Sequence, residues 1–548
     1  MKTTMLCAAA LLAAALTSNA AHAQQPPPCD TLALLPAAGV HDPLRDFART
    51  AQLMGQAPLR PRLFERASAE PSPALCAGAL APWARRAAPQ PAEGAAALEL
   101  LPVGVRGALN SSYPVDRNNG VLWGGVGSGI VLEGGATLRW GPLSLAAAPI
   151  VAYQQNTSFE TLPVELPGSS PFAHAWYPLG IDWPQRFGSS GFTTLSPGQS
   201  YVRLDHRGAA LGFATENLWW GPARRYPILM SNTAGGFPHA FIGTSRPLDI
   251  GIGRLAAELV WGHLGESDFF DDDRANDRTL FAGALLAFEP APLPGLFLGA
   301  ARAHLSRIPP GGLALGDYIS VPYFDPLENP RDTATANNQL FSLFFRWAHA
   351  PSGFEAYAEW AREDNFDGWR DLLFEPDHSQ GYMLGLQKVL DYGRSWYRLA
   401  AELIHLESSI THRSGRGIVS FYTHGRIGQG YTHRGQLLGA AIGPGSGAQF
   451  LALDRFDPGG SLGVFIERVR HNTDTYHSVW SQWFANTAHD VEVTGGINAL
   501  RTLADFELFG ELALSHRQHR NFIGLHPGDP RFISENNLHL EVGGRWWP

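Results

Sequence analysis

The chain has 548 residues and a formal net charge of −9 at pH 7. This acidic balance argues against nucleic acid as a partner, because proteins bind a phosphate backbone through an excess of Lys and Arg. Beyond residues 1–23, no stretch approaches the roughly 18 consecutive apolar residues of a membrane-spanning helix. The chain nevertheless contains 60 glycines and 11% aromatic residues, which is unusual for a soluble secreted protein.

Residues 1–23 have the pattern of a secretory signal peptide. Lys2 provides a positive start, Leu6–Leu16 form a short apolar core, and Ala21-His22-Ala23 gives a small-residue cleavage pattern before Gln24. The apolar core is too short to cross a membrane as a helix. We therefore expect the mature protein to be exported to the Gram-negative cell envelope.

Two cysteines remain after this processing, Cys29 and Cys76. In an oxidising periplasm, such a pair is expected to form a disulfide. The chain-entropy model credits a closed loop of about 47 residues with roughly 4 kcal/mol of stabilisation. The alternative is that Cys29 stays free in the N-terminal segment.

Residues 24–94 form a periplasmic N-terminal segment that is predicted to be helical. Asp42 suits a helix N-cap, Pro43 suits the first helical position, and Gly55 ends the segment. The apolar residues between them fall at helical spacing: Leu44, Phe47, Ala48, Ala51 and Met54. Further short helices are predicted at Leu63-Phe64, in 73–80 and in 83–88. Because this segment is too small to bury its own core, we expect it to dock on the rest of the protein.

Residues 95–548 alternate between candidate strands joined by short and by long connections. Eighteen strands are predicted, at 97–109, 124–140, 143–153, 199–206, 210–219, 237–245, 251–262, 279–288, 296–305, 338–348, 354–363, 380–389, 396–407, 434–442, 460–470, 488–500, 504–515 and 536–547. Short turns fall on one side and long loops on the other, and an even count puts both ends of a barrel in the periplasm. The sequence therefore predicts a mainly β fold, a transmembrane antiparallel β-barrel of about 18 strands with a small N-terminal α-helical plug.

One block at the end of a predicted strand combines several polar and aromatic side chains. Glu216, Asn217, Trp219 and Trp220 lie within Thr215–Pro222. A carboxylate and a carboxamide can hydrogen-bond sugar hydroxyls, and indoles can stack on sugar rings. The alternative is that the two tryptophans belong to the aromatic girdle of an outer-membrane barrel.

This block resembles the signature of the capsule assembly Wzi family. Further segments carry the resemblance: Asn110–Pro114, Arg117–Gly120, Asp182–Gly188, Pro197–Tyr201, Gly253–Leu255 and Glu266–Asp268. The match is specific from about residue 40 to 290, and beyond that it follows the strand pattern. The resemblance implies an outer-membrane β-barrel lectin that retains capsular or exopolysaccharide at the cell surface, with N-terminal helices that close the periplasmic end.

The candidate polysaccharide-binding residues follow from this block and from the neighbouring segments. They are Arg117, Asn118, Glu216, Asn217, Trp219, Trp220, Ser231 and Asn232. Because strand 210–219 rises from a short turn, these residues are expected to meet at the extracellular mouth. Arg and Asn are also common in turns, so the structural alternative stays open.

Neither a cofactor nor a metal is expected. The acidic run Asp268–Asp273 lacks the ligand spacing of a calcium loop, and no metalloprotease or nucleophile motif occurs. The expected partners are polysaccharide and outer-membrane lipid, and the protein is expected to be a non-enzymatic monomer. Two rivals remain: a diffusion porin, which needs an open lumen, and an outer-membrane hydrolase, which needs a nucleophile and a base near the mouth.

Overall fold

The computed structural model describes residues 31–34, 43–57, 59, 64–65, 72–76, 87–88, 96–308, 311–313, 318, 337–363, 373–374, 377, 379–415, 420–485, 487–527 and 534–547. The predicted signal peptide and Cys29 lie outside these residues, so the Cys29–Cys76 disulfide stays a prediction. Within the described part of the chain, no helix is both long and apolar enough to span a lipid bilayer.

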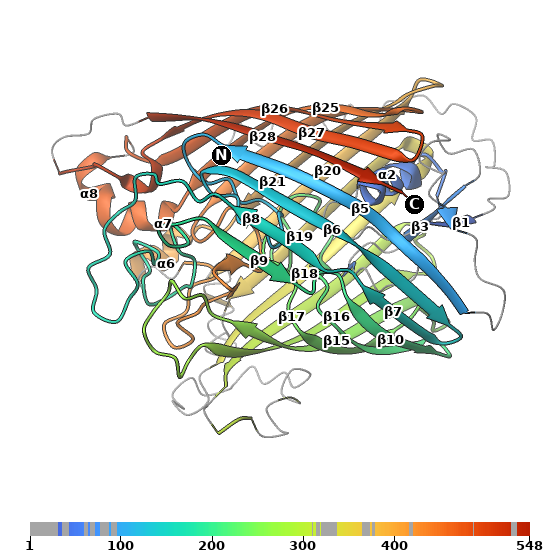
Figure 1. The fold of residues 1–548 in the computed structure, drawn as a ribbon, viewed down its shortest axis with the longest axis horizontal. Helices are drawn as coiled ribbons and strands as arrows, with labels where there is room; N and C mark the ends of the chain where they lie inside the picture. Colours follow the sequence, from blue (N-terminus) through green and yellow to red (C-terminus); the bar gives the residue numbers. More distant parts are fainter. Residues whose placement is uncertain are drawn as a thin grey trace.

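An antiparallel β-barrel of 18 strands dominates the molecule (Figure 1). It closes where the last strand pairs with the first, with Arg545 opposite Gly104. Three of the 18 positions in the wall are each made of two shorter strands: β7 with β8, β9 with β10, and β13 with β14. The predicted fold class is confirmed.

The strands of this sheet are β5 (Ala96–Asn110), β6 (Gly127–Trp140), β7 (Leu143–Ala147), β8 (Ile150–Gln154), β9 (Phe192–Ser196), β10 (Tyr201–His206), β11 (Ala209–Ala214), β13 (His239–Thr244), β14 (Leu248–Asp249), β15 (Gly253–Gly265), β16 (Arg278–Pro290), β17 (Leu296–Arg307), β18 (Asn337–His349), β19 (Phe354–Glu363), β20 (Gln380–Asp391), β21 (Trp396–His405), β24 (Gly447–Asp457), β25 (Gly460–His471), β26 (Asp490–Leu503), β27 (Phe506–Gln518) and β28 (Ser534–Trp546). Outside the wall lie β1 (Thr31–Leu34), β2 (Phe64–Glu65), β3 (Ser72–Cys76), β4 (Ala87–Ala88), β12 (Trp219–Trp220), β22 (Thr432–His433) and β23 (Gln436–Leu437). The described helices are α2 (Pro43–Leu53), α6 (Ile410–Gly415), α7 (Thr473–Thr475) and α8 (Ser481–Phe484), with shorter turns at 350–352, 476–480 and 520–522.

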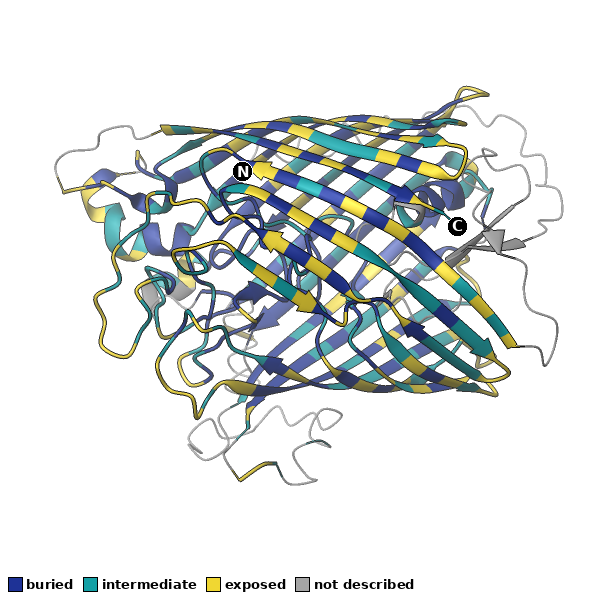
Figure 2. Cartoon of the chain, viewed as in Figure 1, coloured by how far each residue is buried: buried dark blue, intermediate teal, exposed yellow. Residues whose placement is uncertain are grey.

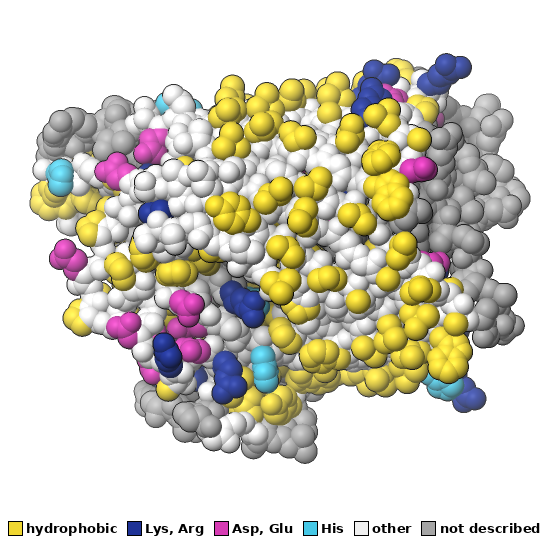
Figure 3. Space-filling view, in the orientation of Figure 1, with side chains coloured by type: hydrophobic (Ala, Val, Ile, Leu, Met, Phe, Trp, Pro, Cys, Tyr) yellow, Lys and Arg dark blue, Asp and Glu magenta, His cyan; other side chains and the backbone are white. Residues whose placement is uncertain are grey.

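Side chains along each wall strand alternate between the outer surface and the lumen (Figure 2). In β25, Leu462, Val464 and Ile466 are each about half exposed, whereas Phe465 and Glu467 between them are buried. On the face shown in Figure 3, hydrophobic side chains cover a broad middle band, and charged side chains gather mainly toward the two ends. Such a band matches the hydrocarbon layer that a transmembrane barrel contacts.

One of the predicted wall strands is wrong. The segment 434–442 is not part of the wall, and the strand at this position is β24 (Gly447–Asp457). The residues Leu437, Leu438 and Ala440 are buried together inside the lumen, so the apolar run lacks the alternation of a lipid-facing strand. In β24 that alternation is present, with Leu451 and Leu453 exposed.

Other predicted boundaries also need correction. The strand predicted at 210–219 ends at Ala214, and the chain then turns into the barrel. Strand β9 (Phe192–Ser196) lies within a segment that was predicted to be a loop. The short helices predicted in 63–88 are also wrong, because the described residues there form β2, β3 and β4.

The two ends of the barrel differ in the length of their connections, as predicted. Short turns at 207–208, 458–459 and 504–505 join strands at the end that holds α2, which we call the helix end. Long segments join strands at the opposite end, which we call the loop end. Helix α2 lies within the lumen at the helix end rather than beneath it (Figure 1).

Helix α2 is confirmed as an amphipathic helix, and it docks through its apolar face. Phe47 stacks on Trp396 with ring centroids 5.5 Å apart, and it contacts Phe456 at 5.9 Å. Ala48 and Ala51 are fully buried beside it. Burial of a phenylalanine contributes about 1.5–3 kcal/mol, so these contacts fix the helix in the lumen.

Two long connections also fold into the lumen. We call residues 215–238 the first inner loop and residues 420–446 the second inner loop. Trp220 and Phe237 of the first inner loop share one buried apolar cluster with Tyr422 and Tyr431 of the second. The rings of the two tyrosines stack on each other with centroids 5.7 Å apart. The described residues therefore fill much of the barrel interior, unlike the open lumen of a diffusion porin.

The wall faces the lumen with two different surfaces. On β15 to β18 most inward side chains are apolar, and we call this the apolar wall: Val260, Leu264, Phe281, Leu285, Phe297, Leu305 and Leu340. On β26 to β28 and β5 many inward side chains are charged, and we call this the charged wall: Asp490, Glu492, Glu507, Glu511, Arg517, Glu541, Arg545 and Arg106.

Candidate functional site

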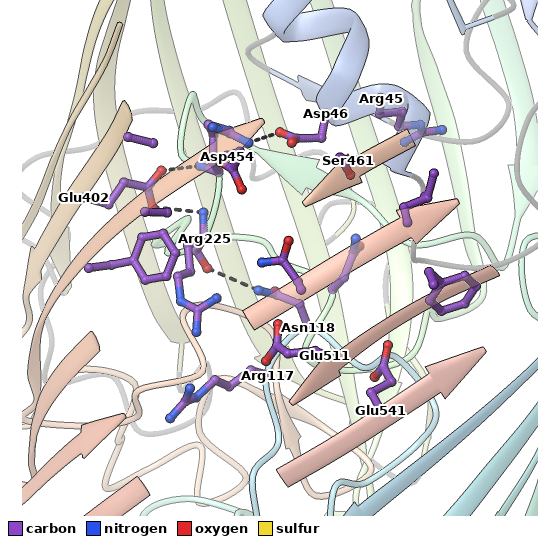
Figure 4. A pocket seen from close by; sticks show the side chains of 18 of the residues that line it. Arg45, Asp46, Arg117, Asn118, Arg225, Glu402, Asp454, Ser461, Glu511 and Glu541 are labelled. Carbon is purple, nitrogen blue, oxygen red and sulfur yellow. Dashed lines mark hydrogen bonds and ion pairs between the residues drawn. The ribbon is translucent and has the colours of Figure 1, made fainter. Parts of the chain in front are cut away.

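A cavity of about 510 Å³ lies in the lumen between α2, the first inner loop, the β5–β6 connection and the barrel wall, including the charged wall (Figure 4). Helix α2 contributes Arg45, Asp46 and Arg49, and the first inner loop contributes the turn around Arg224 and Arg225. The cavity has the size of typical small-molecule sites, which range from about 300 to 1,000 Å³. Its lining combines arginines, carboxylates, carboxamides and aromatic rings.

Two wall carboxylates hold the turn of the first inner loop. Glu402 accepts the backbone N–H groups of Arg224 and Arg225 at 2.6 and 2.9 Å, and the hydroxyl of Tyr357 at 2.7 Å. Glu467 accepts a bidentate pair of hydrogen bonds from the Arg225 guanidinium at 2.8 and 3.0 Å. Bidentate charged pairs fix both position and orientation, so this turn is held firmly above the cavity.

Arg117 joins the same network from the connection between β5 and β6. Its guanidinium pairs with Glu467 and, at 3.1 Å, with Glu492. Burial alone would lower the pKa of Arg117, but these two carboxylates outweigh burial and raise it above its usual range. Arg117 is therefore a fixed cation whose charge is already balanced by the wall.

Asp46 connects α2 to the first inner loop and to the wall strand β21. It pairs with Arg224 of the first inner loop and, at 2.6 Å, with Arg398 of β21. Burial would raise the pKa of the Asp46 carboxyl, but the two guanidinium groups outweigh burial and hold it below its usual range. Asp46 is therefore ionised over the neutral and mildly acidic range and fastens α2 to the loop.

Five of the eight predicted site residues line this cavity. They are Arg117, Asn118, Asn217, Trp219 and Asn232. The other three, Glu216, Trp220 and Ser231, are almost completely buried in the protein. The expectation that all eight meet at the extracellular mouth is wrong, because the chain turns into the lumen after Ala214.

The two adjacent tryptophans have different surroundings. Trp220 is 1% exposed and packs against Phe281 of the apolar wall with centroids 5.9 Å apart. A Cβ at Gly283 would lie 2.4 Å from the Trp220 ring, so only glycine fits beneath it. Trp219 is partly exposed, lines the cavity, and donates its indole N–H to the Ala223 carbonyl at 3.1 Å. Neither tryptophan lies in an outer aromatic girdle.

The polar candidates of the first inner loop make hydrogen bonds that shape the loops. Asn217 donates to the Ala234 carbonyl at 2.8 Å, and Ser231 donates to the Gly439 carbonyl of the second inner loop at 2.6 Å. The Asn232 carbonyl accepts the N–H of Gly120 at 2.7 Å. These contacts join three connections that lie far apart in the sequence.

Sequence reasoning missed a row of inward positions on β24 to β28, four of which line the cavity. Asp454, Gly463, Asn498, Glu511 and Glu541 occupy directly opposed positions on the five consecutive strands β24 to β28. We call these five residues the polar row. The available signal was the alternation within each strand, which places a polar residue toward the lumen, but the sequence does not show that the five lie at one level.

The acidic run Asp268–Asp273 lies in the connection after β15, beside the buried Asp182. Within the described part of the chain, no group of three or more His, Cys, Asp or Glu residues is arranged to hold a metal ion. Asp182 accepts hydrogen bonds from the backbone N–H of Ser267 at 2.7 Å and from its hydroxyl at 2.5 Å. Burial raises the pKa of Asp182 to about 6, against the lowering effect of these hydrogen bonds.

Comparison with known proteins gives a family and a fold. The family model of the capsule assembly protein Wzi matches residues 125–519. The structure is similar to Wzi of Escherichia coli, an outer-membrane protein involved in group 1 capsule assembly and a carbohydrate-binding β-barrel, with a TM-score of 0.57 and 12% identity over 93% of this chain and 98% of that one.

More distant similarity extends to two other solved structures. OccAB2 of Acinetobacter baumannii has a TM-score of 0.40 and 11% identity over 83% of this chain and 98% of its own. OccK2 of Pseudomonas aeruginosa, in complex with glucuronate, has a TM-score of 0.40 and 13% identity over 82% and 98%. Curated protein sequences give no match.

Proposed function

Because the chain belongs to the capsule assembly protein Wzi family, we propose that it is an outer-membrane lectin that binds capsular or exopolysaccharide and retains it at the cell surface. The loop end faces the outside of the cell, and both chain termini lie on the periplasmic side. Many weak sugar contacts, repeated along a long polymer and over many barrels, supply the avidity. No chemical turnover is part of this function.

The interlocking of the two inner loops carries this proposal. Ser231 is hydrogen-bonded across to Gly439, and Tyr422 donates its hydroxyl to the Ile228 carbonyl at 2.6 Å. A barrel whose interior is occupied in this way is poorly suited to free diffusion of solutes. A transmembrane barrel in a capsule-assembly family with such an interior favours binding over transport.

The experiment compares cell-associated and shed polysaccharide in a deletion strain and in strains that carry the gene again. The proposal expects that deletion moves polysaccharide from the cells into the medium, with total production unchanged, and that the wild-type gene reverses this. Equal cell-associated polysaccharide with and without the protein would contradict the proposal. Reduced total production would instead indicate a role in synthesis or export.

The predicted contact residues stay part of this proposal at the positions that line the cavity. Trp219 is the best placed of them, because its indole is partly exposed whereas Trp220 is fully packed. Replacement of Trp219 by Ala is expected to weaken retention while the barrel stays folded. Folding is checked in parallel by heat-modifiable migration on a gel.

A further inference from the structure

Glu511 is the carboxylate of the cavity that the surrounding network leaves open. It projects from the middle of β27 and lines the cavity with Asn498 and Glu541 (Figure 4). Across the described residues, Glu511 has no hydrogen-bond or ion-pair partner, whereas Glu541 pairs with Arg106 at 2.8 Å. Arg225, the inner-loop cation whose charge acts on Glu511, is already engaged by Glu467 through two hydrogen bonds.

The polar row places the Glu511 carboxylate beside a second carboxylate, which is electrostatically unfavourable. Glu511 lies directly opposite Asn498 on one neighbouring strand and Glu541 on the other. Directly opposed side chains lie about 4.5–5.5 Å apart at Cβ, and like charges at such positions are destabilising. A hydrogen-bond donor that enters from the cavity would relieve this repulsion, since carboxylates accept several hydrogen bonds.

The next position in the row is a glycine, and the side chains of its neighbours fill the space above it. Gly463 follows Asn498 in the row, and a Cβ there would lie 2.6 Å from the Asn498 carboxamide oxygen and 2.3 Å from an Asp454 oxygen. The side chains of Asp454 and Asn498 therefore lean over a glycine that has no side chain of its own. Among the described residues, Asn498 makes no side-chain hydrogen bond, so its donor and acceptor also remain available to a ligand.

An aromatic ring also lines the same cavity. Trp219 lines the cavity and makes no ring contact within the described part of the chain, whereas the ring of Phe450 is covered by the Arg225 guanidinium at 4.4 Å and that of Phe509 by Arg545 at 4.8 Å. An open indole can pack against the apolar face of a sugar ring, and its edge is already held by the hydrogen bond to Ala223.

We propose that this cavity is a saccharide-binding site, in which hydroxyl or amino groups of a sugar donate to Glu511, Asn498 hydrogen-bonds the same sugar, and Trp219 stacks on its ring. This inference rests on the proposed function for the source of the sugar, a short unit of the surface polysaccharide. The ligand is neutral or amino-bearing rather than acidic, because the open group is itself a carboxylate, while protein carboxylates already pair with Arg49, Arg117, Arg224, Arg225, Arg398 and Arg545 of the lining.

The test uses the full-length protein in detergent and oligosaccharides released from the host's own surface polysaccharide, separated into a fraction without carboxylates and an acidic fraction. Titration calorimetry is expected to detect binding of the first fraction. Glu511→Gln keeps the shape but removes the charge, and is expected to weaken binding about tenfold or more. Asp505→Asn removes an exposed carboxylate from the turn of the same hairpin and is expected to leave binding unchanged.

Two further variants separate a sugar site from a general effect on folding. Asn498→Ala is expected to weaken binding, and Trp219→Phe is expected to abolish the fluorescence change caused by the oligosaccharide while weakening binding less than tenfold. The proposal is overturned if neither fraction binds, if only the acidic fraction binds, or if binding survives unchanged in Glu511→Gln and Asn498→Ala. Polysaccharide retention by cells is measured with the same variants. If the purified protein does not bind the oligosaccharides at this site, the retention measurement still tests the proposed function separately.

Discussion

The apolar wall and the charged wall belong to one barrel, yet they treat the lumen in different ways. On the apolar wall, Phe281 and Leu285 pack directly against the first inner loop. On the charged wall, Glu492 and Glu541 pair with arginines from the β5–β6 connection and from β5, and a cavity of about 510 Å³ remains in front of them. Both walls hold the loops, and the charged wall borders the cavity.

The difference follows from how each kind of side chain is stabilised. Apolar side chains gain free energy by excluding water, roughly in proportion to the area that they bury, so the apolar wall and the loops close on each other. Buried charges are tolerated only with partners and hydrogen bonds, and their geometry prevents dense packing. The charged wall therefore fixes the loops at a few points and stays open between them.

The largest expected effect is on the apolar wall. Trp220→Ala leaves a cavity beside Phe281 and is expected to lower the free energy of unfolding by about 3–5 kcal/mol. Trp219→Ala, one residue away, removes a partly exposed side chain and is expected to cost about 1 kcal/mol or less. Denaturant titration of both variants in detergent measures the contrast. Equal losses would mean that the two tryptophans are packed alike.

A somewhat smaller effect is expected on the charged wall. Arg225→Ala leaves Glu467 with one partner fewer and is expected to cost about 3 kcal/mol, at the low end for a broken buried pair because Arg117 still contacts this carboxylate. The control is Arg501→Ala, whose guanidinium is more than half exposed and pairs with Asp457 at 3.0 Å. Exposed pairs contribute about 0–1 kcal/mol. A control as damaging as Arg225→Ala would contradict the assignment of Arg225 as an anchor.

The contact between α2 and the first inner loop is expected to be weaker. Asp46→Asn removes the charge that pairs with Arg224 and Arg398, and is expected to cost about 1 kcal/mol because this carboxylate faces the cavity. Asp46 is ionised in the folded protein down to an unusually low pH, so its contribution is present above its ordinary pKa near 3.8 and is lost only in stronger acid.

Planar-bilayer conductance shows whether this contact closes the helix end. The wild-type protein is expected to give small or no currents from pH 7 to 5. The Asp46→Asn variant is expected to show brief channel openings. The control variant Asp249→Asn, which changes an exposed carboxylate at the helix end, is expected to behave like the wild type. Deletion of residues 24–94 is expected to raise the conductance further, with the inner loops still limiting it. Large, steady channels from the intact protein would contradict closure of the lumen by α2 and by the inner loops.

The smallest expected effect concerns Asp182 at the loop end. Its raised pKa means that ionisation of this buried carboxyl lowers the free energy of unfolding. This destabilisation is absent below about pH 4 and fully present above about pH 6. The hydrogen bonds from Ser267 favour the ionised carboxylate, so this contact is expected to weaken, and the Ser267 N–H to lose protection, as the pH falls from 7 to 5. Hydrogen exchange at the backbone N–H of Ser267, corrected for intrinsic pH dependence, measures this. Protection that does not change would contradict it.

The sequence by itself determined the barrel. Outward side chains all meet the same apolar surroundings, so alternation such as Leu538, Leu540 and Val542 in the last strand can be recognised without knowing any neighbour. This alternation determined the number of strands and the sorting of short and long connections. Helical spacing of apolar residues, which is also a local pattern, determined helix α2. The alternation rule failed at 434–442, whose apolar residues are buried by the other inner loop and not by lipid.

Only the tertiary structure decided what happens in the lumen. A side chain such as Trp220, Arg225 or Glu511 meets partners that are tens to hundreds of residues away, and no local pattern states which they are. The sequence could identify Trp219 and Trp220 as one candidate pair, but folding of the first inner loop packs one against the apolar wall and leaves the other facing the cavity. Lipid surrounds every outward position in the same way, whereas each inward position has its own protein neighbours.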